Sequence, residues 1–167
     1  MPKKIKLTKE MFAIVDDCDY HWLSQIKWYA VKGKNKSRDC YYACADLFGG
    51  RKSKVKVLMH RFILLAPHTM TVDHKSHDTL DNRRENLRHA TRAQQNANRL
   101  KSYGASKYKG VHRRWDGLKW VAQIKKSPLH IHLGSFETEE EAAAAYNKAA
   151  KKLFGKFACL NQLNQGE

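Results

Sequence analysis

Acidic side chains are scarce in this sequence of 167 residues, where 16 Asp and Glu stand against 32 Lys and Arg. The formal net charge of +16 at pH 7 attracts polyanions and raises their rate of association, although it says nothing about the fold. The excess is uneven, because residues 51–127 hold 19 basic and 5 acidic side chains. Nucleic acid is the usual partner of such a chain, and an anionic membrane surface is the alternative.

Long apolar runs are also missing. None approaches the roughly 20 residues that a membrane-spanning helix needs, so we expect no membrane segment. The N-terminal stretch "MPKKIKLTKEMF" is basic, but no apolar segment follows it, so a secretory signal is not expected. These absences favour an intracellular protein, in the cytoplasm of a bacterial or phage-infected cell and associated with the nucleoid.

Cysteine is rare, with four residues in the chain, and an intracellular protein normally keeps its cysteines reduced. Cys40 and Cys44 lie in "DCYYACA", where the alternation of a strand places both side chains on one face. No second close pair of Cys or His has the spacing of a zinc finger, and a structural zinc site needs four ligands. Small buried apolar cysteines are therefore the expected interpretation, with a zinc site as the alternative.

The patterns along the chain change near residue 100. "CYYACADLF" and "KVKVLMHRFILL" predict two strands joined by the Gly-led turn "GGRKSK". Residues 80–98 predict a loop followed by a helix, and residues 100–107 predict a linker. Beyond it, "KGVHRRW", "KWVAQIKK" and "IHLGSF" predict three short strands. Thr138 and Glu141 then form a capping box that starts a helix ending at Gly155.

An acidic residue and a histidine, Asp73 and His74, stand side by side within the most basic stretch. Asp supplies a hard oxygen ligand for Mg²⁺, which takes few protein ligands. A neutral histidine beside it can remove a proton from water, while the metal polarises a phosphate. These are the parts of a phosphodiester-cleaving site. Taken alone, however, such a pair is more often a solvated surface pair or a histidine whose hydrogen bonding is satisfied by its neighbour.

The surroundings of this pair carry a resemblance. "MHRFILLAPHTMTVDHKSHDTLDNRRENLRHATRAQQNANR" (residues 59–99) resembles the HNH nuclease family, particularly the phage and intron homing endonucleases, and "FAIVDDCDYHWLSQIKWYA" resembles the leader that precedes such segments. The resemblance implies a β-hairpin followed by a helix, gripping one divalent metal, Mg²⁺ or alternatively Mn²⁺. It implies that Asp73 binds the metal, that His74 is the general base and that Asn86 holds the loop bearing His74. His60 and Arg61 match an "HR" that contacts phosphate or supports the framework.

One position departs from the family. Its helix ligand is usually Asn or His four residues after the Thr of "NLRxxT", and here that position is Gln95, with Asn96 and Asn98 close by. Gln95 and Asn98 would share one helical face, whereas a register change would bring in Asn96. All three stay candidates. The competing interpretation is a degraded metal site in a protein that only binds DNA.

Residues 108–161, "YKGVHRRWDGLKWVAQIKKSPLHIHLGSFETEEEAAAAYNKAAKKLFGKFACLN", are similar to the DNA-binding domain of plant Apetala/ethylene-response-factor proteins. The similarity implies a three-stranded antiparallel sheet in the major groove, packed on one helix through small alanines and Tyr146. The positions that resemble the family's DNA contacts are Lys109, His112, Arg114, Trp115, Lys119, Gln123, Lys125, His130 and His132. Four of them differ in residue type from the plant pattern (His112, Gln123, His130 and His132), so the plant target sequence is not expected.

The sequence thus predicts an α+β protein: an HNH nuclease domain of the ββα-metal type with a β-rich leader (1–99), a linker (100–107) and the plant-like DNA-binding domain (108–163). We expect a monomeric homing-type endonuclease that nicks one strand of duplex DNA and needs no obligate protein partner. A non-catalytic DNA-binding regulator is the alternative. Arg83, Arg84 and Arg88 are expected to contact the DNA backbone or to form a solvated helix face.

Overall fold

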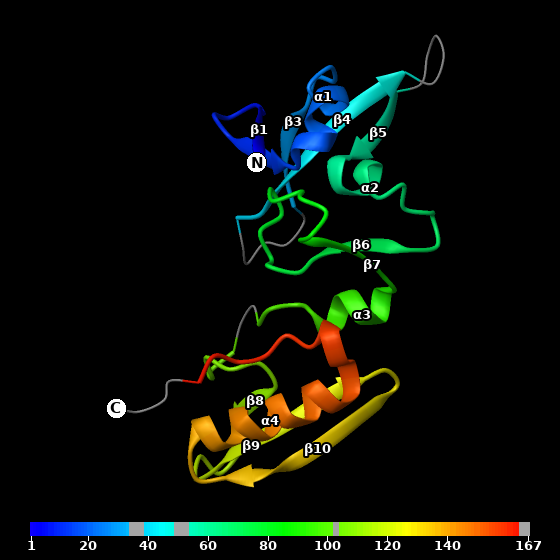
Figure 1. The fold of residues 1–167 in the computed structure, drawn as a ribbon. Helices are drawn as coiled ribbons and strands as arrows, with labels where there is room; N and C mark the ends of the chain where they lie inside the picture. The colour runs from blue at the N-terminus through cyan, green and yellow to red at the C-terminus, as the bar shows by residue number, and fades with distance from the viewer. Residues whose placement is uncertain (34–38, 49–53, 102–103, 164–167) are drawn as a thin grey trace. The chain divides into compact units, whose positions relative to one another are not determined.

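The computed structural model describes residues 1–33, 39–48, 54–101 and 104–163 (Figure 1). The chain forms two compact units, Met1–Arg92 and Ala93–Glu167. Among the described residues, no helix is long and apolar enough to cross a membrane. The mixed content of helices and small antiparallel sheets confirms the predicted α+β class. The domain limits drawn from the sequence stay a prediction.

The first unit contains, in chain order, β1 (Lys3–Lys6), β2 (Phe12–Val15), α1 (Asp17–Leu23), β3 (Tyr29–Lys32), β4 (Tyr41–Phe48), β5 (Lys54–Leu58), α2 (Met59–Ile63), β6 (Thr71–His74) and β7 (Leu87–Ala90). Its strands pair antiparallel: β1 with β2, β4 between β3 and β5, and β6 with β7. The pairing of β4 with β5 matches the two strands predicted there, but the second strand ends at Leu58. The prediction of a strand through the rest of "KVKVLMHRFILL" was wrong, because Met59–Ile63 form helix α2. The turn residues 49–53 lie outside the described residues.

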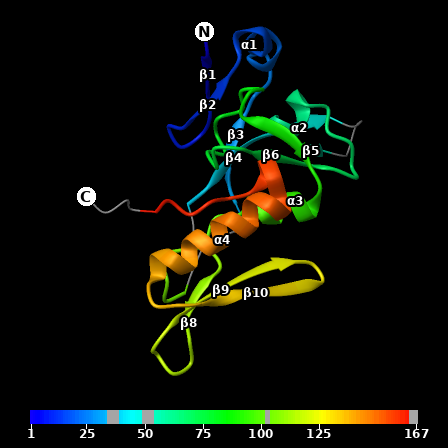
Figure 2. The same ribbon diagram turned by 60° about the horizontal axis from the view of Figure 1, so that its bottom comes forward.

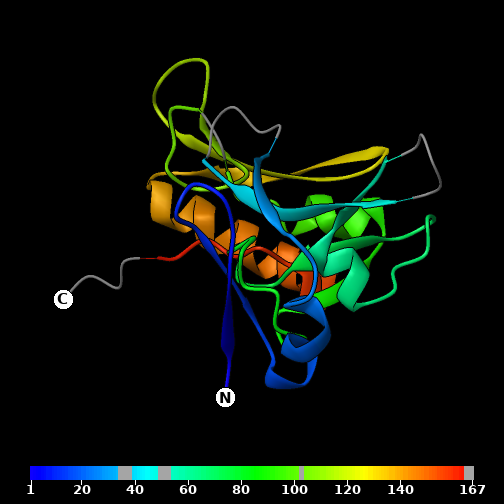
Figure 3. The ribbon, with the colours of Figure 1, turned by 90° about the horizontal axis from the view of Figure 1, so that it is seen from above.

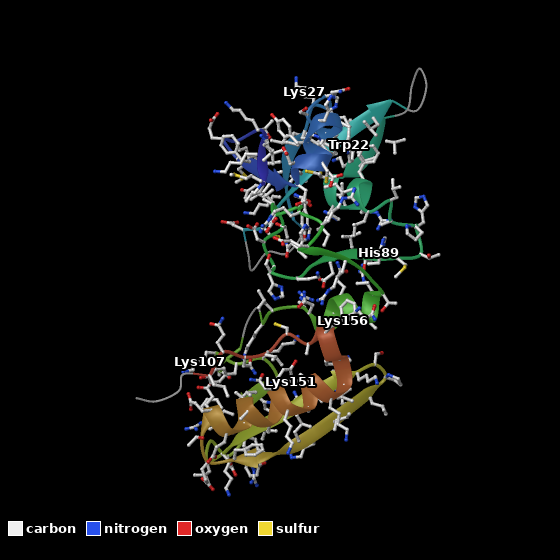
Figure 4. All side chains as sticks on the ribbon, viewed as in Figure 1. Trp22, Lys27, His89, Lys107, Lys151 and Lys156 are labelled. Atoms are coloured by element: carbon white, nitrogen blue, oxygen red, sulfur yellow. The ribbon has the colours of Figure 1, made fainter. Side chains whose placement is uncertain are left out.

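One apolar cluster joins the leader to the hairpin β6–β7. Val15 of β2, Leu23 of α1, Met59 of α2 and Leu87 of β7 are all buried within it. Trp22 of α1, labelled in Figure 4, packs edge-on against Phe62 of α2 with 5.4 Å between the ring centroids. The leader therefore shares its core with the hairpin that carries Asp73 and His74.

The short strand β7 was not predicted by periodicity, which indicated only a loop before a helix. A four-residue strand carries little pattern of its own, and its partner β6 lies thirteen or more residues earlier in the sequence. The pairing of Thr71 with Ala90 and of His74 with Leu87 is a tertiary contact. The family resemblance, which implies a hairpin followed by a helix, indicated this strand where the periodicity did not.

The second unit contains α3 (Arg92–Ala97, starting one residue before the division), β8 (Val111–Arg113), β9 (Trp120–Lys126), β10 (Leu129–Phe136), α4 (Glu139–Phe154) and η1 (Gly155–Phe157). The sheet order is β10-β9-β8, with both pairs antiparallel. Helix α4 runs along β9 and β10 and covers one face of the sheet (Figures 2 and 3). This confirms the predicted sheet packed on one helix.

Helix α4 begins and packs as its sequence predicts. The hydroxyl of Thr138 accepts from the backbone N–H of Glu141 at 3.2 Å, and the Glu141 carboxylate accepts from the backbone N–H of Thr138 at 3.2 Å. Ala142, Ala150 and Tyr146 are buried against the sheet. The small side chains of the two alanines let the helix lie close to the strands.

Candidate functional site

The antiparallel hairpin β6–β7 places Asp73 and His74 at the end of β6. Asp73 lies opposite Arg88 and His74 opposite Leu87. Both side chains are buried, with 7% of Asp73 and 6% of His74 exposed. Since His74 is the last residue of β6, the chain turns directly after it, with the backbone N–H of Lys75 donating to the carbonyl of Asn86 at 2.8 Å.

The carboxylate of Asp73 is held by the guanidinium of Arg88. Nε donates to Oδ2 at 2.8 Å and Nη2 to the same oxygen at 2.6 Å. Both side chains are largely buried, and cross-strand register puts them face to face. The structure therefore places Arg88, predicted from the sequence as a DNA-backbone contact, on the predicted metal ligand.

His74 lies in a cluster with His60 of α2 and Tyr42 of β4. The ring centroids of His60 and His74 are 4.9 Å apart in an edge-on arrangement, and those of Tyr42 and His74 are 6.3 Å apart. Burial, together with the smaller effects of the neighbouring His74 and Arg61, lowers the pKa of His60 to about 3. Burial also lowers the pKa of His74, against the opposing effects of Asn82 and Asp73. Both imidazoles are therefore neutral near pH 7.

His60 has one buried nitrogen, Nδ1, that makes no hydrogen bond within the described part of the chain. A buried polar atom without a partner is costly, and a bound water, an ion or a catalytic role can account for it. Its neighbour Arg61 supports the framework instead: it donates to the carbonyls of Ala66, Pro67 and Met70 at 2.8 to 3.1 Å. Of the two roles that the resemblance offers for "HR", the framework role fits the geometry of Arg61.

Asn86 closes the loop that follows His74. Its Oδ1 accepts from the backbone N–H of Ser76 at 2.9 Å, and its Nδ2 donates to the carbonyl of Asp81 at 2.7 Å. Asn86 is itself buried, so both bonds are shielded from water. This geometry agrees with the predicted task of holding the loop that bears His74. Its importance for a reaction stays a prediction.

Arg83 and Arg84 also have carboxylate partners. Arg83 donates to Asp81 at 2.9 and 2.7 Å, and Arg84 donates to Asp19 of α1 at 2.7 Å through each of two nitrogens. Asp19 is 2% exposed, and a buried carboxylate needs such a partner. Sequence reasoning missed Asp19, although a carboxylate in an apolar leader is a signal that can be read. The predicted contacts of these arginines with DNA stay predictions.

The other candidate ligands belong to the second unit. Gln95 of α3 is half-buried, Asn96 is exposed and Asn98 is buried. Helix α3 ends at Ala97, so Asn98 lies in the turn beyond it, where its backbone N–H donates to the carbonyl of Gln94 at 3.1 Å. Which of the three binds a metal stays a prediction.

The donor set around Asp73 suits a weakly held divalent cation. No three His, Cys, Asp or Glu side chains gather as a metal site within residues 1–33, 39–48, 54–101 and 104–163. Mg²⁺ keeps several waters and often takes only one or two carboxylates. A single buried carboxylate beside neutral imidazoles fits that chemistry, although the cation must share Asp73 with Arg88.

The sheet of the second unit presents a row of polar side chains on the face opposite α4. Lys125 pairs with His130 and Gln123 pairs with His132 across β9 and β10, and all four side chains are exposed. We call these four residues the reading row. His112 of β8 is also exposed. The structure thus brings together five of the nine DNA contacts that the plant resemblance implies.

Three more of those nine residues lie in the β8–β9 loop. Trp115 is 91% exposed, Arg114 forms an ion pair with Asp116 at 3.1 Å, and Lys119 forms one with Glu137 at 2.9 Å. Lys109 differs from the rest, because its Nζ donates to the carbonyl of Ala97, at the end of α3, at 2.6 Å. The ammonium group of Lys109 is therefore already hydrogen-bonded within the second unit.

Comparison with known proteins supports both resemblances. The family described as HNH endonuclease matches residues 66–97, which include Asp73, His74 and Asn86. An uncharacterized HNH endonuclease of Acanthamoeba polyphaga mimivirus is 33% identical over 162 residues, and the match covers 93% of this chain and 78% of that protein. This second match extends through both units.

The plant proteins match a shorter part of the chain. Dehydration-responsive element-binding protein 2E of Oryza sativa subsp. japonica is 49% identical over 59 residues, which is 34% of this chain and 18% of that protein. Dehydration-responsive element-binding protein 2D of Arabidopsis thaliana is 50% identical over 56 residues, which is 32% of this chain and 27% of that protein. The chain thus spans less than a third of these plant relatives. No solved structure matches.

Proposed function

This chain belongs to the HNH endonuclease family, and we propose that it is a site-specific endonuclease that hydrolyses phosphodiester bonds in duplex DNA. The observation that carries the proposal is the buried pair Asp73 and His74 at the end of β6, inside the segment that matches the family. The reading row of the second unit supplies selectivity. Since one chain carries one such pair, the expected product of a monomer is a nick in one strand.

In this proposal His74 is the general base. Its lowered pKa keeps the imidazole neutral near pH 7, so that it can take a proton from water. The water oxygen forms a bond to phosphorus while the bond between phosphorus and the 3′ oxygen breaks. Asn86 fixes the loop after His74 and so limits the movement of the ring.

Asp73 would hold the divalent cation, Mg²⁺ or alternatively Mn²⁺. When bound, that cation would polarise the scissile phosphate and stabilise the departing 3′ oxygen. Arg88 keeps the Asp73 carboxylate in one orientation through two hydrogen bonds to Oδ2.

The experiment is conversion of supercoiled plasmid carrying a selected target to open circle. The wild type should nick with Mg²⁺ or Mn²⁺ and not with EDTA. His74→Ala and Asp73→Ala should each lower the nicking rate by about 100-fold or more, since general base catalysis alone contributes that much. Target binding should stay within a few-fold. His89→Ala, an exposed histidine on β7, is the matched control and should nick normally. Near wild-type nicking by either site variant contradicts the assignment.

A DNA-binding regulator without catalysis is the second candidate. Two observations favour it: Gln95 stands where the family usually has Asn or His, and Arg88 already occupies the Asp73 carboxylate. The same plasmid assay separates the two functions, because a regulator would bind its target tightly and leave the plasmid supercoiled with every divalent metal tried.

A further inference from the structure

A cavity of the second unit lies beside the open end of β9. Strand β8 pairs with β9 only from Trp120 to Ala122, and the backbone N–H of Gln123 then donates to the carbonyl of Gly110 at 2.8 Å. Strand β9 continues to Lys126, and no other described strand pairs with it on this edge. A cavity of about 630 Å³ opens there, and we call it the β9 hollow.

The lining of the β9 hollow carries positive charge from three parts of the unit. These basic residues are Arg99 after α3, Lys109 before β8, and Lys125, Lys126 and His130 of the hairpin β9–β10. None of the described residues that line the hollow is Asp or Glu. Like charges that face one cavity repel one another, and a bound anion removes that repulsion. The lining therefore favours an anionic ligand.

Lys109 is the most enclosed of the four Lys and Arg side chains, because it is half-buried whereas the other three are exposed. Its Nζ donates to the carbonyl of Ala97 at 2.6 Å. An ammonium has three donors, so this bond to a neutral acceptor leaves Nζ able to donate to an anion as well. Burial lowers the pKa of the Lys109 ammonium against the opposing effect of Cys159, and the nearby charge of Arg99 adds to the lowering. A phosphate beside Arg99 and Lys109 would stabilise both charges.

The open edge of β9 adds a backbone donor to the hollow. In an antiparallel strand, alternate residues direct their N–H and carbonyl groups to the same edge. Lys125 therefore directs its backbone N–H to the edge at which Gln123 meets Gly110. Such an edge group is available to a ligand where no neighbouring strand covers it.

The remaining part of the lining is apolar. Ile124 of β9 and the rings of Tyr146 and Phe154 of α4 contribute to it. Aromatic side chains offer a surface for a nucleobase. The volume lies within the roughly 300–1,000 Å³ of sites that take small organic ligands. A single phosphate ion would leave the apolar lining uncovered, so the hollow suits a ligand that combines a phosphate with an aromatic ring.

We propose that the β9 hollow binds a nucleotide, with the phosphate beside Arg99 and Lys109 and the base against the apolar lining. Lys125 and His130 belong both to this hollow and to the reading row. A bound nucleotide would therefore compete with duplex DNA for part of the reading row. Only this competition rests on the proposed function, since nucleotide binding itself requires neither cleavage nor a DNA target.

Calorimetric titration of the full chain, in EDTA and at constant ionic strength, tests the ligand class. Adenosine 5′-monophosphate, inorganic phosphate and adenosine are the three probes. The monophosphate should bind about tenfold or more tightly than either of the other two, because only it reaches both parts of the lining. Equal affinities for the monophosphate and inorganic phosphate would overturn the proposal.

Two variants test the site. Arg99→Gln and Lys126→Gln each remove an exposed charge of the lining and should weaken binding of the monophosphate by about tenfold. Lys151→Gln is the matched control, because Lys151 is an exposed lysine of α4 outside the lining. An equal loss in Lys151→Gln would mean that net charge alone attracts the nucleotide and would overturn the proposal.

Amide chemical shifts locate the ligand independently of the variants. Addition of the monophosphate should shift the amides of Gly110 and Ser127, which line the hollow, and leave that of Gly117 in the β8–β9 loop unchanged. Shifts confined to residues outside the lining would contradict the assignment.

Duplex binding distinguishes a free nucleotide from a phosphate of the DNA backbone. Saturating monophosphate should weaken duplex binding by the wild type, and the same concentration should have a smaller effect on Arg99→Gln. If the hollow takes only a backbone phosphate, Arg99→Gln will lower duplex affinity and the salt slope by about one, while the monophosphate fails to bind. That result would overturn the proposal. Absence of duplex binding by the wild type would instead refute the reading row, and calorimetry would still test the hollow.

Discussion

In the first unit, burial beside other rings changes the pKa of a single histidine. His60, 5% exposed, contacts the rings of His74 and Tyr42 and follows Met59 at the start of α2. Its pKa of about 3 lies well below the ordinary value of 6.5, so the folded protein keeps His60 neutral where the unfolded chain binds a proton. Stability must therefore fall as the pH drops from about 6.5 toward 3.

A change of His60 should reveal this dependence. His60→Gln should not lose stability in this way. As the pH is lowered from 6 to 4, its free energy of unfolding relative to that of the wild type should rise by roughly 1 kcal/mol per pH unit. Urea unfolding at several pH values measures it. His89→Gln changes an exposed histidine and should follow the wild type at each pH. A constant difference between His60→Gln and the wild type would mean that His60 is protonated in the folded state.

Ion pairing with carboxylates changes the role that the sequence suggests for three arginines. The sequence predicted that Arg83, Arg84 and Arg88 contact the DNA backbone or form a solvated helix face. The helix face was wrong, because these residues lie in the loop before β7 and in β7 itself, and each is paired with a carboxylate. The partner of Arg84, Asp19, lies 65 residues earlier in the chain. Net charge counts such residues as available cations, whereas the structure shows that much of their charge is already matched.

At the scale of elements, the approach of α4 to the sheet depends on glycine at one position. Gly110 has a φ of +75°, and an added Cβ would lie 2.2 Å from Cδ2 of Tyr146 and 2.6 Å from the carbonyl oxygen of Gln123. Gly117, in the β8–β9 loop, has a φ of +72° and nothing within 4 Å of an added Cβ. A residue with a Cβ would thus be strained at either position, but its Cβ would collide with neighbouring atoms only at Gly110.

Gly110→Ala should therefore destabilise the second unit more than Gly117→Ala. Both should lose about 1 kcal/mol from the left-handed backbone. Gly110→Ala should lose a further 1–3 kcal/mol or more from overpacking against Tyr146. Thermal unfolding of the two variants measures the difference. Equal losses would mean that α4 can shift away from β9 at little cost.

At the scale of the whole molecule, the two units divide the chain within residues that the sequence assigned to the nuclease domain. A fragment that begins at Ala93 keeps the hydrogen bond from Nζ of Lys109 to the carbonyl of Ala97, whereas one that begins at Lys107 loses it. We expect both to fold, because each retains the sheet and α4. The longer fragment should be the more stable.

Duplex binding by the fragment that begins at Ala93 should fall steeply with salt, since each lysine that neutralises a phosphate releases counterions. Lys125→Met, in the reading row, should reduce the slope of log affinity against log salt by about one. Lys151→Met is the control, because Lys151 lies exposed on α4 (Figure 4) and outside the reading row. Equal slopes for the wild type and both variants would refute the assignment of the reading row.

The sequence by itself determined the features that depend on local pattern. The capping box at Thr138 and Glu141, the three strands before α4 and the alanine face of that helix follow from short-range spacing, and the structure confirms them. Asp73 and His74 are likewise neighbours in the sequence itself, and the segment that matches the family includes both.

Tertiary structure alone decided which partner each polar group takes. Asp73 meets Arg88 through hairpin register, His74 meets His60 because α2 folds back beside β6, and Lys109 turns to Ala97 rather than joining the reading row. Such pairings join residues far apart in sequence. They also depend on burial, which makes an unpaired charge costly and a matched one stable. No local pattern encodes that choice, because it depends on where the rest of the chain packs.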